Sequence, residues 1–170
     1  LADALARFVA DYPRIVVRVM MRDWDELLRR LRAREIEFFV AEFSTFGNEN
    51  DLDIEPLSPH PSFIIARRGH PLAGRGPLGL ADGFAYPYAS LTRIPPRSLE
   101  PIRLAQRRAS DATAAYRVFP ALEFNALAAV RKIVLGSDAL MVAPLACVAD
   151  ELAGERLVVL GSEPYLAVSY

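Results

Sequence analysis

The sequence predicts an α/β protein made of two lobes, each with strands alternating with helices, and joined by crossover strands. Helical and strand-type periodicities alternate along the whole chain of 170 residues. The apolar run Phe63–Ala66 predicts a buried strand, and it lies between two such α/β halves. A turn rich in glycine and proline follows it, from Gly69 to Gly79. One strand that joins two α/β halves is typical of a two-lobed binding domain with a cleft between the lobes.

Composition excludes several classes of protein. The chain is 52% hydrophobic and 24% charged, which is typical of a globular fold. Its net charge of −1 provides no overall positive field for nucleic acid. The one cysteine, Cys147, cannot form an internal disulfide, and no apolar run approaches the roughly 20 residues that cross a membrane. The sequence starts within a helical pattern and ends within a strand pattern, so we expect a piece of a longer protein.

The first half predicts an alternation of helices and strands. Leu5, Phe8 and Tyr12 recur at helical spacing before Pro13, which predicts a helix over Leu1–Tyr12. Asp23 is the expected N-cap of a second helix, with Glu26 completing a capping box. The strands expected in this half are Ile15–Met21, Ile36–Phe43 and Leu52–Leu57. This order implies parallel pairing with right-handed crossovers.

The second half repeats the alternation. Asn125 and Pro144 are expected to start helices that Gly136 and Gly154 close. Pro101 is expected in the first turn of a helix that Ser98 caps. The predicted helices are Ser98–Ala109, Ala126–Leu135 and Pro144–Leu152. The predicted strands are Tyr86–Ser90, Tyr116–Phe124 with Pro120 at an edge or bulge, Ala139–Ala143, Leu157–Leu160 and Tyr165–Ser169.

The sequence contains no motif for catalysis or for metal or cofactor binding. His60 and His70 both precede proline and have no second ligand at metal spacing, so a loop or turn role is expected for each. Cys147 has no histidine near it in the sequence, and the glycines from 69 to 79 match no phosphate-binding loop. The string Thr92-Arg93-Ile94 is similar to a Thr-Arg-Phe string of prephenate dehydratases. A dehydratase-like enzyme is therefore an alternative to the main prediction, which is a protein without enzymatic activity, metal or cofactor.

The signal for a ligand site lies at the ends of the predicted strands. In open α/β sheets, ligands bind outside the carboxyl ends of the strands. Several of these ends lead into helix N-termini, whose free N–H groups favour anions. Arg22 and Arg93 could clamp a carboxylate with two hydrogen bonds, so we expect a small carboxylate; solvated or capping roles are the alternative. The predicted binding residues are Arg22, Asp23, Trp24, Glu42, Phe43, Ser90, Leu91, Thr92, Arg93, Phe124, Asn125 and Pro144.

Several strings, taken in order, resemble the effector-binding domain of LysR-type transcriptional regulators. They are LARFVADYP at Leu5–Pro13, DELLRRLRAREIEFFVAE at Asp25–Glu42, FIIARRGHPLA at Phe63–Ala73, PLGLADGFAYP at Pro77–Pro87, EFNALAAVRKIVLGSDALMVAP at Glu123–Pro144 and VADELAGERLVVL at Val148–Leu160. The resemblance implies a fold like that of type II periplasmic binding proteins, with two Rossmann-like lobes joined by two crossover strands. These would be Phe63–Ala66 and Tyr165–Ser169, paired with each other in space. Lobe I would comprise residues 1–60 and 165–170, and lobe II residues 61–164. The first strand and C-terminal helix of lobe I, and an N-terminal winged helix-turn-helix, would lie outside this chain.

The resemblance also implies a function. The domain would bind a small anionic effector between its lobes, at the residues given above. It would form a homodimer or homotetramer by packing Leu1–Tyr12 of one copy against Ala126–Leu135 of another. The whole protein would be cytoplasmic, with no membrane partner, and would bind DNA only through the N-terminal domain. Many family members carry small or hydroxylated residues at Arg22-Asp23-Trp24, so Trp24 would narrow or cover the cleft. A solute-binding protein of a transporter, which shares the fold, is the alternative.

Overall fold

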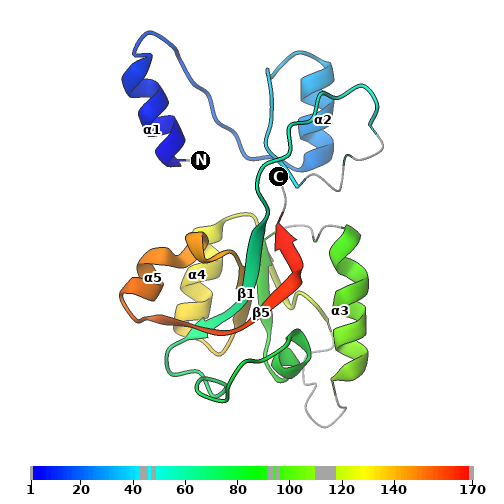
Figure 1. Ribbon diagram of the computed structural model, residues 1–170, viewed down its shortest axis with the longest axis vertical. Helices are drawn as coiled ribbons and strands as arrows, with labels where there is room; N and C mark the ends of the chain where they lie inside the picture. The colour runs from blue at the N-terminus through cyan, green and yellow to red at the C-terminus, as the bar shows by residue number, and fades with distance from the viewer. Residues whose placement is uncertain are drawn as a thin grey trace. The chain divides into compact units, whose positions relative to one another are not determined.

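The computed structural model describes residues 2–42, 46, 49–91, 94, 96–109 and 118–168. The chain divides into two compact units, Leu1–Ala41 and Glu42–Tyr170 (Figure 1). No helix in the described part of the chain is long and apolar enough to span a membrane. The lobe boundaries that the resemblance implies, at residues 60 and 165, stay a prediction.

The first unit contains two helices, α1 (Ala2–Asp11) and α2 (Trp24–Arg32), and both confirm helices that the periodicity predicts. The ring of Phe8 on α1 lies near that of Tyr12, the residue after the end of the helix, with centroids separated by 4.9 Å, and both are exposed. On α2 the apolar face buries Leu27. Each helix therefore has an apolar stripe, but the stripe on α1 is exposed to solvent in the single chain.

Ion pairs, rather than a capping hydrogen bond, involve the charged side chains at the start of α2. Asp23 is the N-cap, as predicted, but its side chain makes no capping hydrogen bond. The predicted capping box is wrong, because the carboxylate of Glu26 lies 2.8 Å from Arg30 and 3.5 Å from Arg22 instead of returning to the N-cap. Arg30 also lies 2.9 Å from Glu35, so one guanidinium joins two carboxylates along the helix.

The end of α2 is a Schellman motif with an unusual residue. The N–H groups of Arg34 and Glu35 donate to the carbonyls of Leu31 and Arg30, at 2.9 Å each. Arg34 has a φ of 57°, in the left-handed region where glycine is favoured. The same motif ends a helix of the second unit, where Glu155 has a φ of 52°.

Two strands predicted for the first unit are wrong in the part the structure describes. Residues 15–21 and 36–42 are irregular, while Phe43 lies outside the described residues. A strand needs a neighbouring strand to take its hydrogen bonds, and the described residues of this unit offer none to either segment. Val16 is 92% exposed and Phe38 75% exposed, so no sheet face covers their side chains. The predicted strand Leu52–Leu57, in the second unit, is irregular as well.

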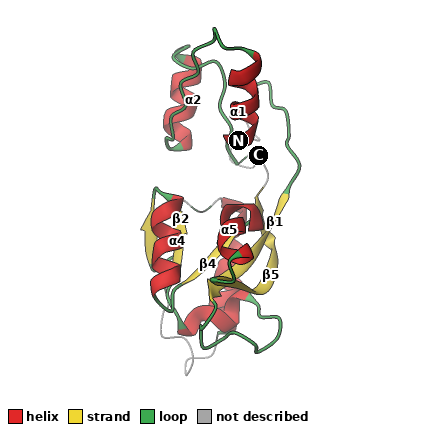
Figure 2. Ribbon diagram, turned by 90° about the vertical axis from the view of Figure 1, so that its left-hand side faces the viewer, coloured by secondary structure: helices red, strands yellow, loops and turns green. Residues whose placement is uncertain are grey.

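The second unit is organised around a five-stranded mixed sheet with the order β3-β2-β4-β1-β5 (Figure 2). Strand β2 runs parallel to β3 and β4, whereas β1 runs antiparallel to β4 and β5. The strands are β1 (His60–Arg67), β2 (Tyr88–Leu91), β3 (Leu122–Phe124), β4 (Leu140–Ala143) and β5 (Leu157–Val168). They confirm the strands predicted around residues 63–66, 86–90 and 139–143. The expected α/β fold class is confirmed as well.

The last two predicted strands are one continuous strand, β5, which pairs with β1 along its length. Phe63 stands opposite Ser162 and Ala66 opposite Val158. The expected pairing of Phe63–Ala66 with Tyr165–Ser169 is therefore wrong in register, although both segments lie in paired strands and residues 169–170 lie outside the described part. Register shifts between 60 and 62 and between 64 and 65 allow β5 to continue past the expected break at residues 161–164.

Helices cover both faces of this sheet. One core cluster contains Ile64, Phe84, Tyr88 and Ile102, and the other contains Ile65 and Val130. Neighbouring residues of β1 thus enter opposite cores, as the alternation of side chains along a strand requires. The covering elements are the 3-10 helix η2 (Leu80–Ala85) and α3 (Pro96–Arg108) on one face, and α4 (Leu127–Gly136), the 3-10 helix η3 (Leu145–Val148) and α5 (Ala149–Ala153) on the other.

Helix boundaries differ from the predicted ones where proline or strand geometry intervenes. Helix α3 starts at Pro96 rather than at Ser98, because a proline needs no hydrogen-bond partner in the first turn; Pro101 consequently lies inside the helix. Asn125 is not the cap of α4: β3 runs to Phe124, so the turn out of the strand delays the N-cap to Ala126.

The remaining differences concern β3 and the ends of α4 and α5. Of the predicted strand 116–124, residues 118–121 are bends and only 122–124 pair, because Pro120 has no N–H to donate; residues 116 and 117 lie outside the described part. Gly136 is the last residue of α4, not its closing residue. Pro144–Leu152 is split into η3 and α5, and the left-handed residue after α5 is Glu155 rather than Gly154.

Candidate functional site

Parallel strands bring the predicted binding segments of the second unit to one edge of the sheet. Leu91, the last residue of β2, stands opposite Phe124, the last residue of β3. Strand β4, also parallel to β2, ends at Ala143, which stands opposite Phe63 near the start of β1. We call this the carboxyl edge, defined by Leu91, Phe124, Ala143 and Phe63. Ser90, Leu91, Phe124, Asn125 and Pro144 of the predicted site all lie there.

The carboxyl edge is also where two helices begin. Helix α3 follows β2 and α4 follows β3, so both N-termini are at the edge of the sheet at which those strands end. The unpaired N–H groups and the dipole of a helix N-terminus favour negative charge nearby. Ser90 adds a hydroxyl, which donates to the Leu91 carbonyl at 3.0 Å. The carboxyl edge therefore combines these polar groups with the apolar side chains of Leu91 and Phe124.

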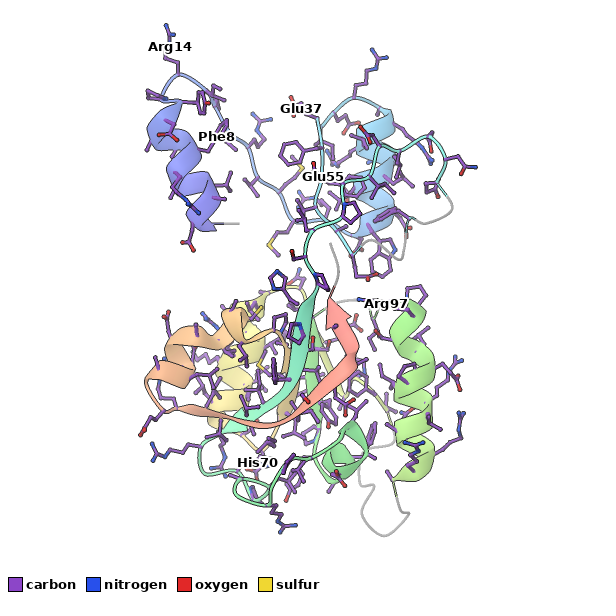
Figure 3. The ribbon with its side chains drawn as sticks, viewed as in Figure 1. Phe8, Arg14, Glu37, Glu55, His70 and Arg97 are labelled. Atoms are coloured by element: carbon purple, nitrogen blue, oxygen red, sulfur yellow. The ribbon has the colours of Figure 1, made fainter. Side chains whose placement is uncertain are left out.

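Glu42 and Arg97 form an ion pair in this unit. The side chain of Glu42 is 7% exposed, and its Oε1 atom lies 2.8 Å from Nε of Arg97. The guanidinium of Arg97 also donates from Nη2 to the carbonyl of Ala167, near the end of β5. Figure 3 labels Arg97 at the end of α3 where the helix begins. One guanidinium therefore holds both a buried carboxylate and the final part of β5.

Arg97 is absent from the residues that the sequence predicts for the site. Placing the helix start at Ser98 left Arg97 in the preceding loop. The string Pro95-Pro96 was the available signal, because proline is favoured at the first position of a helix. A start at Pro96 puts Arg97 in the first turn, at the carboxyl edge, which is where the structure has it.

The other predicted residues are divided between the first unit and the undescribed part of the chain. Arg22, Asp23 and Trp24 lie at the start of α2, in the first unit. Arg22 donates to the Met21 carbonyl at 2.7 Å and lies 3.5 Å from Glu26, so its charge already has local partners. Their participation in one site with the carboxyl edge stays a prediction. Phe43, Thr92 and Arg93 lie outside the described residues.

His70 has a structural role, away from the carboxyl edge. It is 3% exposed, its Nδ1 accepts the Leu72 N–H at 3.0 Å, and its Nε2 lies 3.2 Å from the Asp138 carbonyl. These partners fix a neutral ring with the proton on Nε2. Burial lowers the pKa of His70 below 6.5, although the hydrogen bond to Asp138 and the charge of Asp138 oppose the shift. The loop role expected from the sequence thus has a physical basis.

A buried carboxylate also joins α4 to α5. Glu151 is 6% exposed and lies 3.4 Å from Arg131 and 3.7 Å from Arg156. Burial raises the pKa of the neighbouring Cys147 thiol, which keeps it protonated and a weak nucleophile. Within the described residues, no group of three or more His, Cys, Asp or Glu side chains could hold a metal ion.

Comparison with known proteins identifies relatives over the whole chain. The family model "LysR substrate binding domain" matches residues 1–169. The chain is 33% identical over 165 residues to the SDS degradation transcriptional activation protein of Pseudomonas sp. (strain ATCC 19151), covering 96% of this chain and 51% of that protein. It is 28% identical over 158 residues to the HTH-type transcriptional regulator GalR of Pseudomonas putida, covering 92% of this chain and 38% of GalR. The chain thus spans about half of the first of these curated relatives and less than half of the second.

Solved structures show the same fold. The regulatory domain of CcmR from Synechocystis PCC6803, in complex with 2-PG, superposes with a TM-score of 0.66 at 20% identity, over 94% of this chain and 73% of that one. The probable transcriptional regulator PA0477 from Pseudomonas aeruginosa gives a TM-score of 0.67 at 18% identity, over 99% of this chain and 54% of that one.

Proposed function

The chain belongs to the LysR substrate-binding domain family, and from this membership we propose that it is the effector-sensing domain of a bacterial transcriptional regulator that responds to a small anion. The expected resemblance is confirmed by the family match over residues 1–169. The relatives found by sequence are named as transcriptional regulators, so the prediction of a non-enzymatic domain is confirmed, and the dehydratase-like and transporter alternatives lose their support.

The observation that carries the anionic effector is the Arg97–Glu42 pair beside the carboxyl edge. An arginine held in the first turn of a helix, already in contact with a carboxylate, is a group that recognises anions. The parallel ends of β2, β3 and β4 add Ser90, Asn125 and the start of α4 at the same edge. The CcmR regulatory domain, which has the same fold, is solved in complex with 2-PG, so 2-PG is one of the ligands worth testing. The predicted location of this site between two lobes remains part of the proposal.

A thermal-shift screen tests the anionic effector. Candidate carboxylates and phosphorylated acids, 2-PG among them, are added to the purified chain, each beside an uncharged amide or ester of the same skeleton. A ligand present at about 100 times its Kd adds roughly 2.7 kcal/mol of stability. For a domain of this size that raises Tm by roughly 5–11 °C. If only uncharged molecules raise Tm, the effector is not an anion.

The regulator as a whole would be a cytoplasmic homodimer or homotetramer that binds DNA through an N-terminal domain outside this chain. The exposed apolar face of α1, with Phe8, Val9 and Tyr12, supports pairing through this helix against α4 of another copy. Sedimentation velocity tests it. Phe8→Arg should shift the chain from dimer to monomer, whereas Arg7→Glu, which changes an exposed charged residue next to it on α1, should not. A chain that stays monomeric at high concentration would exclude dimerisation by this domain.

A further inference from the structure

We propose that Arg97 is the residue of this domain that recognises the anionic group of the effector, and that Glu42 is a built-in competitor that occupies Arg97 when no effector is bound. The proposal rests on the proposed function, because it deepens the description of the same site. It assigns a role to Arg97, which the sequence did not select. It also changes the role of Glu42, from a residue that contacts the effector to one that the effector displaces.

The pair has the features of a binding site for one carboxylate. Oε1 of Glu42 lies 2.8 Å from Nε of Arg97, while Nη2 of the same guanidinium donates to the Ala167 carbonyl. Different nitrogens of Arg97 thus hold the carboxylate and the backbone. The carboxylate can be exchanged without disturbing the bond to β5, because the two contacts use separate donors.

Burial differs between the two partners, and the difference favours exchange. Glu42 is 7% exposed, whereas the side chain of Arg97 is 34% exposed. An incoming anion can therefore reach the guanidinium from solvent. Arg97 also lies in the first turn of α3, which remains favourable for negative charge after Glu42 departs. A ligand carboxylate in place of Glu42 keeps the local charge balance unchanged.

The other ion pair of α3 offers a contrast. Glu100 and Arg107 also lie 2.8 Å apart, but their side chains are 68% and 61% exposed. Such an exposed pair contributes little and forms no enclosed site when one partner is removed. Among the ion pairs of the described residues, the Arg97–Glu42 pair is the one that combines the same distance with a buried carboxylate. The two pairs are therefore matched in chemistry and separation and differ in burial.

Rescue of a missing carboxylate by acetate tests the proposal without any knowledge of the effector. In Glu42→Ala the space of the Glu42 carboxylate is vacated, and acetate should enter it and bind Arg97. We expect acetate, compared with chloride at equal ionic strength, to raise the Tm of this variant in a saturable way. The rise should be roughly 3–6 °C once acetate exceeds its Kd about tenfold. Wild type, Glu42→Ala/Arg97→Gln and Glu100→Ala should show no acetate-specific rise.

Two further measurements cover an unfolded Glu42→Ala variant and the affinity for an identified effector. If Glu42→Ala does not fold, Glu42→Gln removes the negative charge of residue 42 while keeping the size of its side chain. In that variant, addition of acetate should shift the Nε–H signal of Arg97 in NMR spectra. For an effector found by the screen, Glu42→Gln should lower Kd by about tenfold or more, since the charge of Glu42 no longer competes for Arg97. Arg97→Gln should raise Kd by at least as much.

The outcomes separate this proposal from the proposed function. The anion site at Arg97 is overturned if acetate neither stabilises Glu42→Ala nor shifts the Arg97 Nε–H signal of Glu42→Gln. An effector whose Kd is unchanged by Glu42→Gln and by Arg97→Gln also overturns it, while leaving the sensor function intact. If acetate rescues Glu42→Ala but no anion in the screen binds wild type, the Arg97 site stands and the proposed anionic effector fails.

Discussion

The position of β2, which carries Ser90 and Leu91 to the carboxyl edge, depends on a close fit between Gly83 and Tyr88. An added Cβ at Gly83 would overlap the Tyr88 hydroxyl, and it would lie 2.6 Å from Cδ1 of Leu140. The hydroxyl donates to the Leu80 carbonyl at 3.1 Å, and the Tyr88 ring is 1% exposed. Gly83→Ala therefore forces the ring away and breaks this hydrogen bond.

The cost of Gly83→Ala has two parts. Overpacking a core contributes about 1–3 kcal/mol. Losing the hydrogen bond, with the Leu80 carbonyl left unsatisfied, contributes about 1–3 kcal/mol. A midpoint of about 4 kcal/mol lowers the Tm of a chain of this size by roughly 8–16 °C. Tyr88→Phe alone should cost only the second part, since the ring stays in place.

The double variant Gly83→Ala/Tyr88→Phe makes the reasoning testable. Phenylalanine has no hydroxyl to collide with the new Cβ, and the hydrogen bond is lost once rather than twice. The double variant should therefore be about 1–3 kcal/mol more stable than the sum of the single effects predicts. Urea unfolding followed by far-UV circular dichroism measures this, because the only tryptophan, Trp24, lies in the first unit. Additive single effects would refute the argument.

Three further predictions concern other parts of the fold. Gly161→Ala would push a Cβ into the Leu78 carbonyl, so it should cost about 1–3 kcal/mol in urea unfolding, whereas Gly136→Ala, with nothing within 4 Å, should be neutral or stabilising. A similar loss in both glycine variants would contradict this. Arg34→Gly should stabilise the first unit by up to about 1 kcal/mol, because it relieves a left-handed φ of 57°; a lower thermal midpoint would count against it. His70 has a lowered folded pKa, so the unfolded state takes up its proton first and stability is lost as pH falls below 6.5. The loss should not exceed about 1.4 kcal/mol per pH unit, and His70→Gln should flatten this part of the pH profile; an unchanged profile would show that His70 contributes nothing to it.

The elements that the sequence predicts well are those that depend on nearby residues. The periodicity of α1, the apolar run of β1 and the buried strand β4 are local patterns, and the structure confirms them. The strand predicted over Ile15–Met21 also rests on a local sequence pattern, but the prediction is wrong. Its β-branched residues favour an extended chain, yet a ladder partner is a non-local requirement that no local pattern contains.

Strand β5 shows the reverse case, in which a strand forms where the local sequence predicts a loop. Gly161-Ser162-Glu163-Pro164 has the composition of a loop, and the sequence therefore predicts a break there. Contacts distant in the sequence keep the segment in the sheet: the Glu163 carboxylate accepts the Leu80 N–H, and Leu78 donates to the Leu160 carbonyl at 2.9 Å. Prediction of the candidate site from the sequence has the same limit. The role of Arg97 depends on its contacts with Glu42 and Ala167, which are distant from it in the sequence.

Arg97 has partners that connect it to two distant parts of the second unit. Glu42 is the first residue of that unit, and Ala167 lies near the end of the long strand β5. The contact of Arg97 Nε with Glu42 Oε1, at 2.8 Å, is an ion pair between a buried carboxylate and a partly exposed guanidinium. An effector carboxylate that replaces Glu42 at Arg97 needs to supply only about 1–3 kcal/mol, the energy that typically couples allosteric sites. If Arg97 recognises the effector, binding changes the contact between Glu42 and Arg97 while the bond from Arg97 to β5 remains. This exchange of carboxylates takes place at the residue that directly follows residues 1–41.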